Sequence, residues 1–195
     1  MAWDTEGTKR KILNAAVVQF ADLGPDGATI ELVAKTAGVN KERVYKYFGD
    51  KQSLFRTVLS EELAKVAQAV AIEALTVEDI GEYAGRAYDY HREHPELNRL
   101  LSWEGLVLNG KVPDEDVRRK FYIVKTQAIQ DAQEAGIVTR DFDADHLAFL
   151  ILGLAGWWAA LPQVARMFAG TDDAREHARR RASVVLAARR LALAP

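Results

Sequence analysis

Basic, polar and aromatic side chains are concentrated between Lys41 and Lys51, in the segment KERVYKYFGDK. Guanidinium, ammonium, carboxylate and hydroxyl groups are the groups with which proteins contact phosphates and base edges. Arg43 could donate two hydrogen bonds to a guanine, and Glu42 could accept one from a cytosine. Two alternatives stay open, because Glu42 could instead pair with Lys46 one helical turn away, and Tyr45 could pack on the following helix. The chemistry that this segment favours is contact with a nucleic acid.

Two short helices separated by a sharp turn would present these side chains. Thr29 is a suitable N-cap for the first helix, in which apolar residues recur at helical spacing. Gly38 ends that helix, because a sharp turn between helices favours a residue that tolerates positive φ. Asn40 is suited to cap the second helix, which buries Val44. This pattern is typical of a helix-turn-helix, whose second helix enters the major groove of DNA.

Over about two dozen residues the segment resembles the DNA-binding domain of TetR-type repressors. The matching positions are Thr29, Ile30, Val33, Ala34, Ala37, Gly38, Val39, Val44, Tyr45, Tyr47, Phe48, Lys51 and Leu54. Tyr47 departs from the family, which more often has histidine there, and Asn40 stands where serine is common. Both replacements keep a hydrogen-bonding side chain. The resemblance implies a DNA-binding head, a helical body with a ligand pocket, and a homodimer formed by the two C-terminal helices of each chain.

Nine side chains in or beside the motif are expected to contact double-stranded operator DNA. Lys51 and its backbone N–H stand at the start of a helix, where a phosphate binds readily. Thr29 can offer a hydroxyl to a phosphate, and Tyr47 matches the position of the family's phosphate-contacting histidine. The predicted set is Thr29, Asn40, Lys41, Glu42, Arg43, Tyr45, Lys46, Tyr47 and Lys51.

Length and charge fit a small head joined to a larger body. The chain has 195 residues, of which 49% are hydrophobic, and its net charge is −2. Residues 1–60 contain nine Lys and Arg against seven Asp and Glu, whereas the remainder contains 17 against 21. The head is therefore mildly basic and the body acidic, which fits a local DNA-binding face. Because the chain has no cysteine, disulfides and thiolate metal sites are excluded, and a reducing cytoplasm is the simplest setting.

Neither a secretory signal nor a membrane span is expected. The N-terminal sequence is charged where a signal peptide would have an apolar region. The most apolar stretch, Ala148 to Leu161, has 14 residues, whereas a helix needs roughly 18–20 to cross a bilayer. We therefore expect a cytoplasmic protein that has no membrane partner.

Helical periodicity along the whole chain predicts an all-α fold of about nine helices. The first three form a helix-turn-helix DNA-binding domain over residues 5–51, with the motif at 29–48. Residues 52–195 form a helical effector-binding and dimerisation domain, and residues 51–72 form the helix that links the two.

Capping residues and helix breakers mark helix boundaries within the second domain. Thr76 and Asp79 mark one start, and Thr171 marks another. Pro95 begins a new helix because proline fits the first turn. A helix end is expected at Asn109-Gly110.

The helix that begins near Asp143 carries a heptad-like apolar seam and is apolar on every side from Ala148 onward. A dimer would place two recognition helices roughly 34–36 Å apart, or a multiple of that distance, as one turn of DNA requires. The seam could also be ordinary core within one chain, but the resemblance implies a dimer. The predicted interface residues are Leu147, Leu150, Leu154, Trp158, Leu161, Ala182, Val185 and Leu186.

Aromatic residues gather in the middle of the chain, where the family keeps its ligand pocket. An apolar cavity with a few polar groups is the usual form of a small-molecule site, although the same residues could form core. Glu104 could contact a cationic or hydroxylated ligand, or it could be a surface or ion-paired glutamate. The predicted lining residues for an unknown effector are Tyr83, Tyr90, Trp103, Glu104, Phe121 and Trp157.

The function that these features favour is a homodimeric repressor released from its operator by a small-molecule effector. One alternative is a DNA-binding regulator without a ligand, and another is an all-α enzyme with Glu104 as general acid or base. The sequence has no Gly-rich phosphate loop and no Gly-x-Ser-x-Gly motif. His91 and His94 lack a third metal ligand at a suitable spacing. We therefore predict no catalytic residue, no cofactor and no metal.

Overall fold

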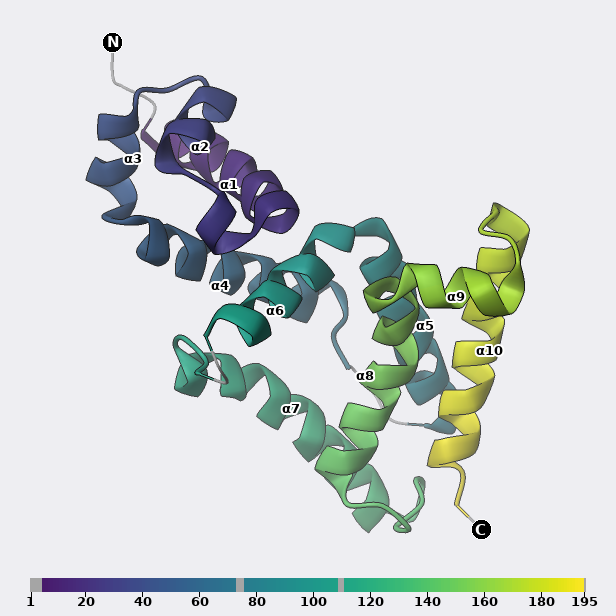
Figure 1. The fold of residues 1–195 in the computed structure, drawn as a ribbon. Helices are drawn as coiled ribbons and strands as arrows, with labels where there is room; N and C mark the ends of the chain where they lie inside the picture. The colour runs from purple at the N-terminus through teal and green to yellow at the C-terminus, as the bar shows by residue number, and fades with distance from the viewer. Residues whose placement is uncertain (1–4, 73–75, 109–110, 195) are drawn as a thin grey trace. The chain divides into compact units, whose positions relative to one another are not determined.

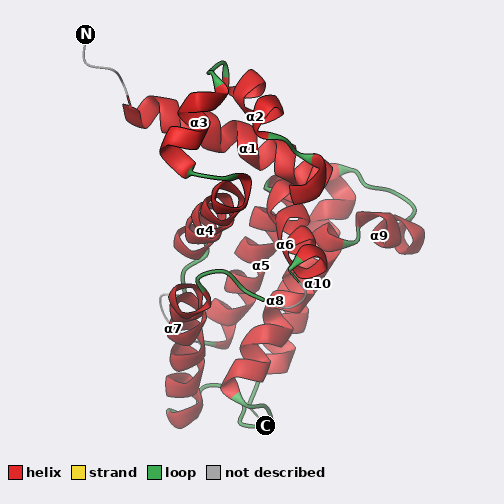
Figure 2. Ribbon diagram, turned by 60° about the vertical axis from the view of Figure 1, so that its left-hand side comes forward, coloured by secondary structure: helices red, strands yellow, loops and turns green. Residues whose placement is uncertain are grey.

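The computed structural model describes residues 5–72, 76–108 and 111–194 (Figure 1). These residues form ten helices, and their only β-type pairing is an isolated bridge between Val138 and Leu193 (Figure 2). The all-α prediction is confirmed. The expected count of about nine missed α9 (Pro162–Ala169), an eight-residue helix with proline in its first turn. The helix end predicted at Asn109-Gly110 lies outside the described residues.

The chain divides into two compact units, and the first contains residues 1–65 and 96–115. Residues 96–115 thus join the expected three-helix head. The helices of this unit are α1 (Thr5–Gly27), α2 (Ile30–Ala37), α3 (Lys41–Phe48), most of α4 (Lys51–Ala69) and most of α6 (Pro95–Val107). All five contribute to one core, whose fully buried side chains include Ile12, Phe20, Val33, Val44, Leu54 and Leu100. Helices as short as α2 and α3 depend on this tertiary packing, because eight residues are marginal as an isolated helix.

A break near the end of α1 gives α6 a place to pack. Gly24 has φ 71° and ψ 170°, which interrupts the helix before Pro25. The indole of Trp103, from α6, lies against the Cα of Gly24 so closely that a Cβ there would be 2.9 Å from two ring carbons. The same indole donates a hydrogen bond to the Ala21 carbonyl at 3.2 Å. Gly24 therefore serves both the backbone turn and the contact between α1 and α6.

The second unit contains residues 66–95 and 116–195. Its helices are the end of α4, α5 (Val77–Glu93), α7 (Glu115–Glu134), α8 (Ala144–Ala160), α9 and α10 (Ala174–Ala192). Helix α5 packs against both α8 and α10, and those two also contact each other. The expected start at Thr76 is confirmed by a capping box, in which Thr76 and Asp79 each accept a hydrogen bond from the other's backbone N–H.

Close packing and charge pairing join α5 to α10. A Cβ at Gly81 would collide with the Arg189 side chain, and one at Gly85 would collide with Arg181, so the two helices approach closely at these glycines. Arg181 Nε donates to Asp89 Oδ2 at 2.7 Å across the same contact. This contact orients α10 on α5 and thereby fixes which face of α10 remains outside.

No single helix among the described residues has both the length and the apolar composition to cross a membrane. Only α8 and α9 taken together meet that test, and they are bent by 86° where they join.

Candidate DNA-binding interface

Helices α2 and α3 begin at the residues that the sequence predicts, and α2 also ends at the predicted residue. Thr29 Oγ1 accepts a hydrogen bond from the Leu32 N–H at 3.1 Å, and Asn40 Oδ1 accepts one from the Arg43 N–H at 3.1 Å. Gly38 ends α2 in the left-handed conformation, with φ 68° and ψ 33°. Both cap predictions are confirmed, and so is the turn at Gly38. Each capping side chain still has a hydrogen-bond donor left for a phosphate, namely the Thr29 hydroxyl and the Asn40 amide.

One face of α3 packs on the core and the other is open to solvent. Val44 is buried, whereas Lys41, Glu42, Tyr45 and Lys46 are exposed. Among the described residues no ion pair joins Glu42 to Lys46, and Lys41 instead approaches Glu31 at 3.5 Å. Tyr45 is 47% exposed. The solvent face of α3 thus offers cations, a carboxylate and a phenol, which are groups suited to a DNA groove.

The side chains of Tyr47 and Lys51 are held in place by contacts within the first unit. The Tyr47 ring is partly buried against the core of the first unit. Lys51 Nζ donates to the carbonyls of Ala28 at 3.1 Å and Asp26 at 3.4 Å. Because Ala28 directly precedes Thr29, Lys51 ties the start of α4 to the start of the motif.

The first turn of α4 is capped by a carboxylate. Asp50 Oδ1 accepts a hydrogen bond from the Ser53 N–H at 2.7 Å, and this bond lowers the pKa of Asp50. Asp50 is therefore charged at neutral pH. Its carboxylate already lies at the N-terminus of α4, the end of a helix that favours negative charge. A phosphate near Lys51 would have to lie beside this carboxylate.

The predicted dimer residues fall into two groups. Leu147 and Val185 are buried in the core of the second unit. For these two residues the alternative interpretation, core within one chain rather than dimer interface, is therefore correct. Leu154, Trp158 and Leu161 are partly buried. Leu150, Ala182 and Leu186 are exposed.

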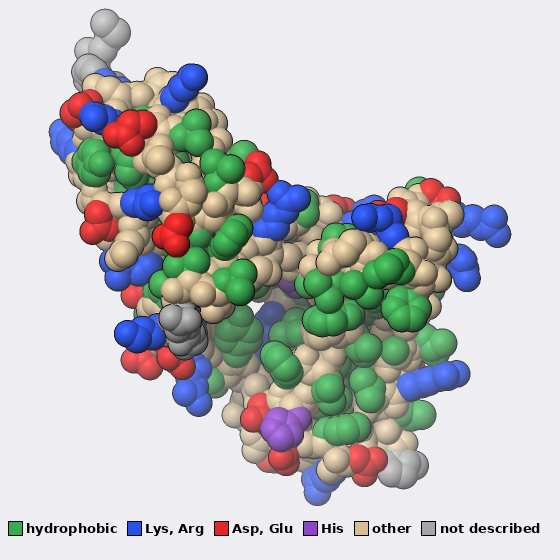
Figure 3. Space-filling model, viewed as in Figure 1, with side chains coloured by type: hydrophobic (Ala, Val, Ile, Leu, Met, Phe, Trp, Pro, Cys, Tyr) green, Lys and Arg blue, Asp and Glu red, His purple; other side chains and the backbone are tan. Residues whose placement is uncertain are grey.

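Exposed apolar side chains on α8 extend the outward-facing group. Phe149 is 77% exposed and Trp157 is 63% exposed. Gly153 lies midway between them, and a Cβ there would meet no atom within 4 Å. Figure 3 shows hydrophobic side chains gathered over α8 on the face turned to the viewer. We call the exposed residues Phe149, Leu150, Gly153, Trp157, Ala182 and Leu186 the α8–α10 face.

The predicted effector residues lie in different surroundings. Trp103 and Glu104 are on α6 in the first unit, where Trp103 packs on Gly24 and Glu104 is buried. Phe121 and Trp157 are exposed on the second unit. Tyr90 stacks on His94, with ring centroids 4.2 Å apart.

Tyr83 is the predicted effector residue whose surroundings best suit a ligand. Only 3% of Tyr83 is exposed, and its hydroxyl has no hydrogen-bond partner among the described residues. Burial raises the pKa of this phenol well above its usual range. Tyr83 lines a cavity of about 390 Å³ together with Gln68, Ile72, Asp79 and Arg86. A buried hydroxyl without a partner can supply one specific hydrogen bond to a bound molecule.

Lys125, on α7, is a candidate residue that the sequence reasoning missed. Its ammonium group lies 5.3 Å from the centre of the Tyr83 ring, and burial lowers its pKa. The signal available in the sequence is weak, because Lys125 follows the apolar run Phe121–Val124 and looks like an ordinary surface lysine.

Three exposed residues at the start of α8 have ligand atoms close enough together to hold a cation. Ligand atoms of Asp143, Asp145 and His146 all lie within 4.8 Å of one another. Exposed acidic groups of this kind are common, and we assign the cluster no function.

The fold and the exposed face of α3 together define a DNA-binding protein of the helix-turn-helix class. Residues 12–58 match the sequence profile described as "Bacterial regulatory proteins, tetR family", and residues 79–190 match "Tetracyclin repressor-like, C-terminal domain". The chain belongs to the TetR family of transcriptional regulators. The members of this family are DNA-binding regulators rather than enzymes.

Individual relatives agree with this assignment. Over 174 residues, 89% of each chain, the protein is 39% identical to HTH-type transcriptional repressor SCO4008 of Streptomyces coelicolor. The crystal structure of transcriptional regulator SCO4942 from the same species is similar, with a TM-score of 0.82, 29% identity, and coverage of 96% of this chain and 99% of that one. The structure of AibR in complex with isovaleryl coenzyme A and operator DNA has the same fold, with a TM-score of 0.62, 20% identity, and coverage of 78% and 85%.

Proposed function

We propose that the protein acts as a homodimeric repressor in the cytoplasm and leaves its operator when a small-molecule effector binds. Residues 5–51 contact DNA, residues 52–195 carry the effector site and the dimer interface, and α4 connects the two functions. The observation that carries the proposal is the pairing of an exposed polar face on α3 with an exposed apolar face on α8 and α10. One face suits a DNA groove, and the other suits a second copy of the chain.

In this proposal six of the nine predicted DNA contacts divide into readers and positioners. Arg43 and Glu42, near the N-terminus of α3, contact base edges, and Lys46 lies along the groove wall. Thr29 and Asn40 donate to phosphates from the caps that they form. Lys51 acts at the DNA surface and also holds the connection between α1 and α2.

Arg43→Ala and Lys46→Ala should affect DNA binding in different ways. Loss of Arg43 removes a base contact, so binding should weaken by about 1–3 kcal/mol and preference should relax at one base pair. Loss of Lys46 removes a phosphate contact, so all sequences should bind more weakly by a similar factor and the salt slope should fall by about one. Fluorescence anisotropy on a site selected from random DNA, with each base pair varied and salt titrated, measures both effects.

Lys120→Ala, an exposed lysine on α7, is the matched control for the loss of a positive charge. If the Arg43 and Lys46 variants gave the same profile across all sequences, the assignment of Arg43 as a reader would be wrong.

An effector in the second unit is supported by buried Tyr83 and by partly buried Lys125, whose ammonium group lies over the Tyr83 ring. The AibR complex indicates that this fold can accommodate a small molecule and operator DNA. Here the Tyr83 hydroxyl could donate to a ligand, and the nearby ammonium group of Lys125 could approach a polar or anionic part of it. A ligand screen that follows release of the protein from DNA identifies the effector.

Tyr83→Phe should be neutral or stabilising in the free protein, by up to about 1 kcal/mol, because it removes a buried hydroxyl that has no partner. Tyr88→Phe on the same helix is the matched control, because the Tyr88 hydroxyl is 3.0 Å from His177 Nδ1. Loss of the Tyr88 hydroxyl should lower the free energy of unfolding by roughly 0.5–1.5 kcal/mol. Thermal unfolding of the two variants gives the comparison. Equal destabilisation of both would mean that the Tyr83 hydroxyl is bonded in the free protein.

Release by an effector has a thermodynamic requirement that can be tested directly. A ligand that lowers DNA affinity must itself bind the DNA complex more weakly, by the same factor. Calorimetric titration of the effector into the free protein and into the protein–operator complex measures that factor. Equal affinity in the two titrations would rule out release by this effector.

A further inference from the structure

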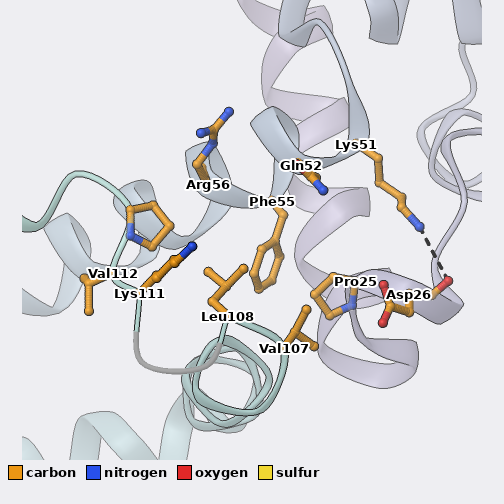
Figure 4. A pocket seen from close by; sticks show the side chains of 11 residues that line it. Pro25, Asp26, Lys51, Gln52, Phe55, Arg56, Val107, Leu108, Lys111 and Val112 are labelled. Carbon is orange, nitrogen blue, oxygen red and sulfur yellow. Dashed lines mark hydrogen bonds between the residues drawn. The ribbon is translucent and has the colours of Figure 1, made fainter.

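A cavity within the first unit lies close to the DNA-binding motif, and apart from Lys51 its lining residues have no role in the function proposed above. Its volume is about 320 Å³, and its walls come from the end of α1, the first turns of α4, the end of α6 with Leu108, and residues 111–113 (Figure 4). All of its lining residues belong to residues 1–65 and 96–115, so it is a feature of that unit alone. The effector pocket proposed at Tyr83 belongs to the second unit, so the two cavities are separate sites.

The middle of the cavity is apolar. Pro25, Phe55, Val107 and Leu108 all line it, and Figure 4 shows the Phe55 ring between Leu108 and Pro25. Phe55 also belongs to the core of the unit and packs edge-on against Phe20. The wall is therefore rigid at its centre, and it offers a preformed surface to an apolar group.

Positive charge borders this apolar surface. Arg56 and Lys111 both line the cavity, and neither forms an ion pair with any residue that the structure describes. Figure 4 shows the Lys111 side chain extending toward Leu108 and Phe55, whereas the guanidinium of Arg56, the residue after Phe55 on α4, points away from the Phe55 ring. Arg56 Nη2 donates to Ser53 Oγ at 3.0 Å, which leaves its other N–H groups available.

The one acidic side chain in the lining lies away from these two cations. Asp26 is next to Pro25, where Lys51 donates to the Asp26 carbonyl at 3.4 Å. In Figure 4 Lys51 and Asp26 are on one side of Phe55, and Lys111 and Arg56 are on the other. The cavity thus has a cationic end with spare donors, an apolar middle, and an end where a lysine and an aspartate balance each other.

We propose that this cavity binds a small amphipathic anion. Its anionic head group would lie between Arg56 and Lys111, and its apolar part would contact Phe55, Val107 and Leu108. A charged head group needs cations with free N–H groups, and an apolar body needs an apolar surface, so both halves of the site match this class of ligand. If each non-hydrogen atom needs the ~30 Å³ that a water molecule occupies in the liquid, a cavity of this volume holds about ten such atoms.

Octanoate, an eight-carbon carboxylate, is a probe of that size and chemistry. Calorimetric titration of octanoate into the full-length protein should give a saturable site in the first unit. Octanamide has the same shape without the charge and should bind at least about tenfold more weakly, as loss of a charge-assisted contact predicts. Octyl phosphate, titrated in parallel, shows whether a phosphate head group binds as well as a carboxylate, and saturable binding of either anion at this site supports the proposal.

Two kinds of variant locate the site. Arg56→Ala combined with Lys111→Ala removes two exposed cations and should weaken octanoate binding at least about tenfold. Val107→Trp should fill the cavity and abolish binding there. Controls that should leave octanoate affinity unchanged are Lys120→Ala, an exposed lysine outside the cavity, and Arg86→Ala, which alters the cavity at Tyr83 in the second unit.

Several results would overturn the proposal. They are equal affinity for octanoate and octanamide, unchanged affinity in the Arg56 and Lys111 double variant, or no saturable binding of either octanoate or octyl phosphate at millimolar concentration. Loss of binding in Arg86→Ala alone would also overturn it, because octanoate would then occupy the second unit. Far-UV circular dichroism of the double variant checks that the fold is retained, which is expected because both side chains are exposed.

Discussion

Replacing Leu150 and Leu186 with glutamate is expected to convert the proposed dimer into monomers and to weaken operator binding at least about a hundredfold. Both side chains are exposed on the α8–α10 face, at 43% and 50%, so the fold of the single chain should not change. In a two-fold symmetric interface each substitution occurs twice, so four carboxylates would be brought together where apolar surface should be buried. A monomer retains only one half-site contact, and specific binding by DNA-binding dimers exceeds non-specific binding by about 10³ or more.

Analytical ultracentrifugation and anisotropy on the selected operator measure the two parts of this prediction. Val124→Glu is the control, because Val124 is 66% exposed on α7 in the same unit but outside the α8–α10 face. That variant should remain dimeric and bind normally. If the Leu150 and Leu186 variant remained a dimer, the subunits would associate through another surface.

Gly24→Ala is expected to destabilise the first unit by about 2–6 kcal/mol, more than any other single change considered above. The conformation at Gly24, φ 71° and ψ 170°, is one that residues with a Cβ rarely adopt, at a cost of about 1–3 kcal/mol. The new Cβ would also lie 2.9 Å from the Trp103 ring, and such overpacking costs about 1–3 kcal/mol. Denaturant unfolding followed by circular dichroism measures the change in the free energy of unfolding.

Two other glycines in the same unit separate these contributions. Gly38→Ala keeps the positive φ, here 68°, but meets no atom within 4 Å, so it should cost only about 1–2 kcal/mol. Gly105→Ala lies within α6 in open space, and it should be neutral or stabilise by up to about 1 kcal/mol. A Gly24→Ala variant no less stable than Gly38→Ala would show that the Trp103 contact adds nothing.

The amino-acid sequence was sufficient for the features that depend on near neighbours in the chain. The caps at Thr29, Asn40 and Thr76 and the turn at Gly38 each involve hydrogen bonds to residues a few positions away. Local signals of this kind, together with helical periodicity, predicted the all-α fold and the helix-turn-helix. They also carried the family resemblance that the sequence profiles confirm.

Side-chain surroundings that depend on distant residues could not be predicted in this way. Trp103 was expected in an effector pocket, but it packs on Ala21 and Gly24, about eighty positions earlier in the chain. Nothing in the spacing of aromatic residues distinguishes a tryptophan that lines a pocket from one that fills a gap beside a glycine. The same holds for Lys125, whose position over the Tyr83 ring depends on how α7 packs near α5.

The segment from Thr29 to Lys51 shows where the two kinds of information meet. The sequence by itself determined that this segment is a helix-turn-helix, because the caps and the turn are local. Only the tertiary structure decided that Lys51 donates hydrogen bonds to the carbonyls of Asp26 and Ala28. It also decided that one apolar face of α8 is exposed rather than buried in the core of the second unit. The physical reason is that hydrogen bonds within a helical turn follow from adjacent residues, whereas burial depends on which surfaces the whole chain brings together.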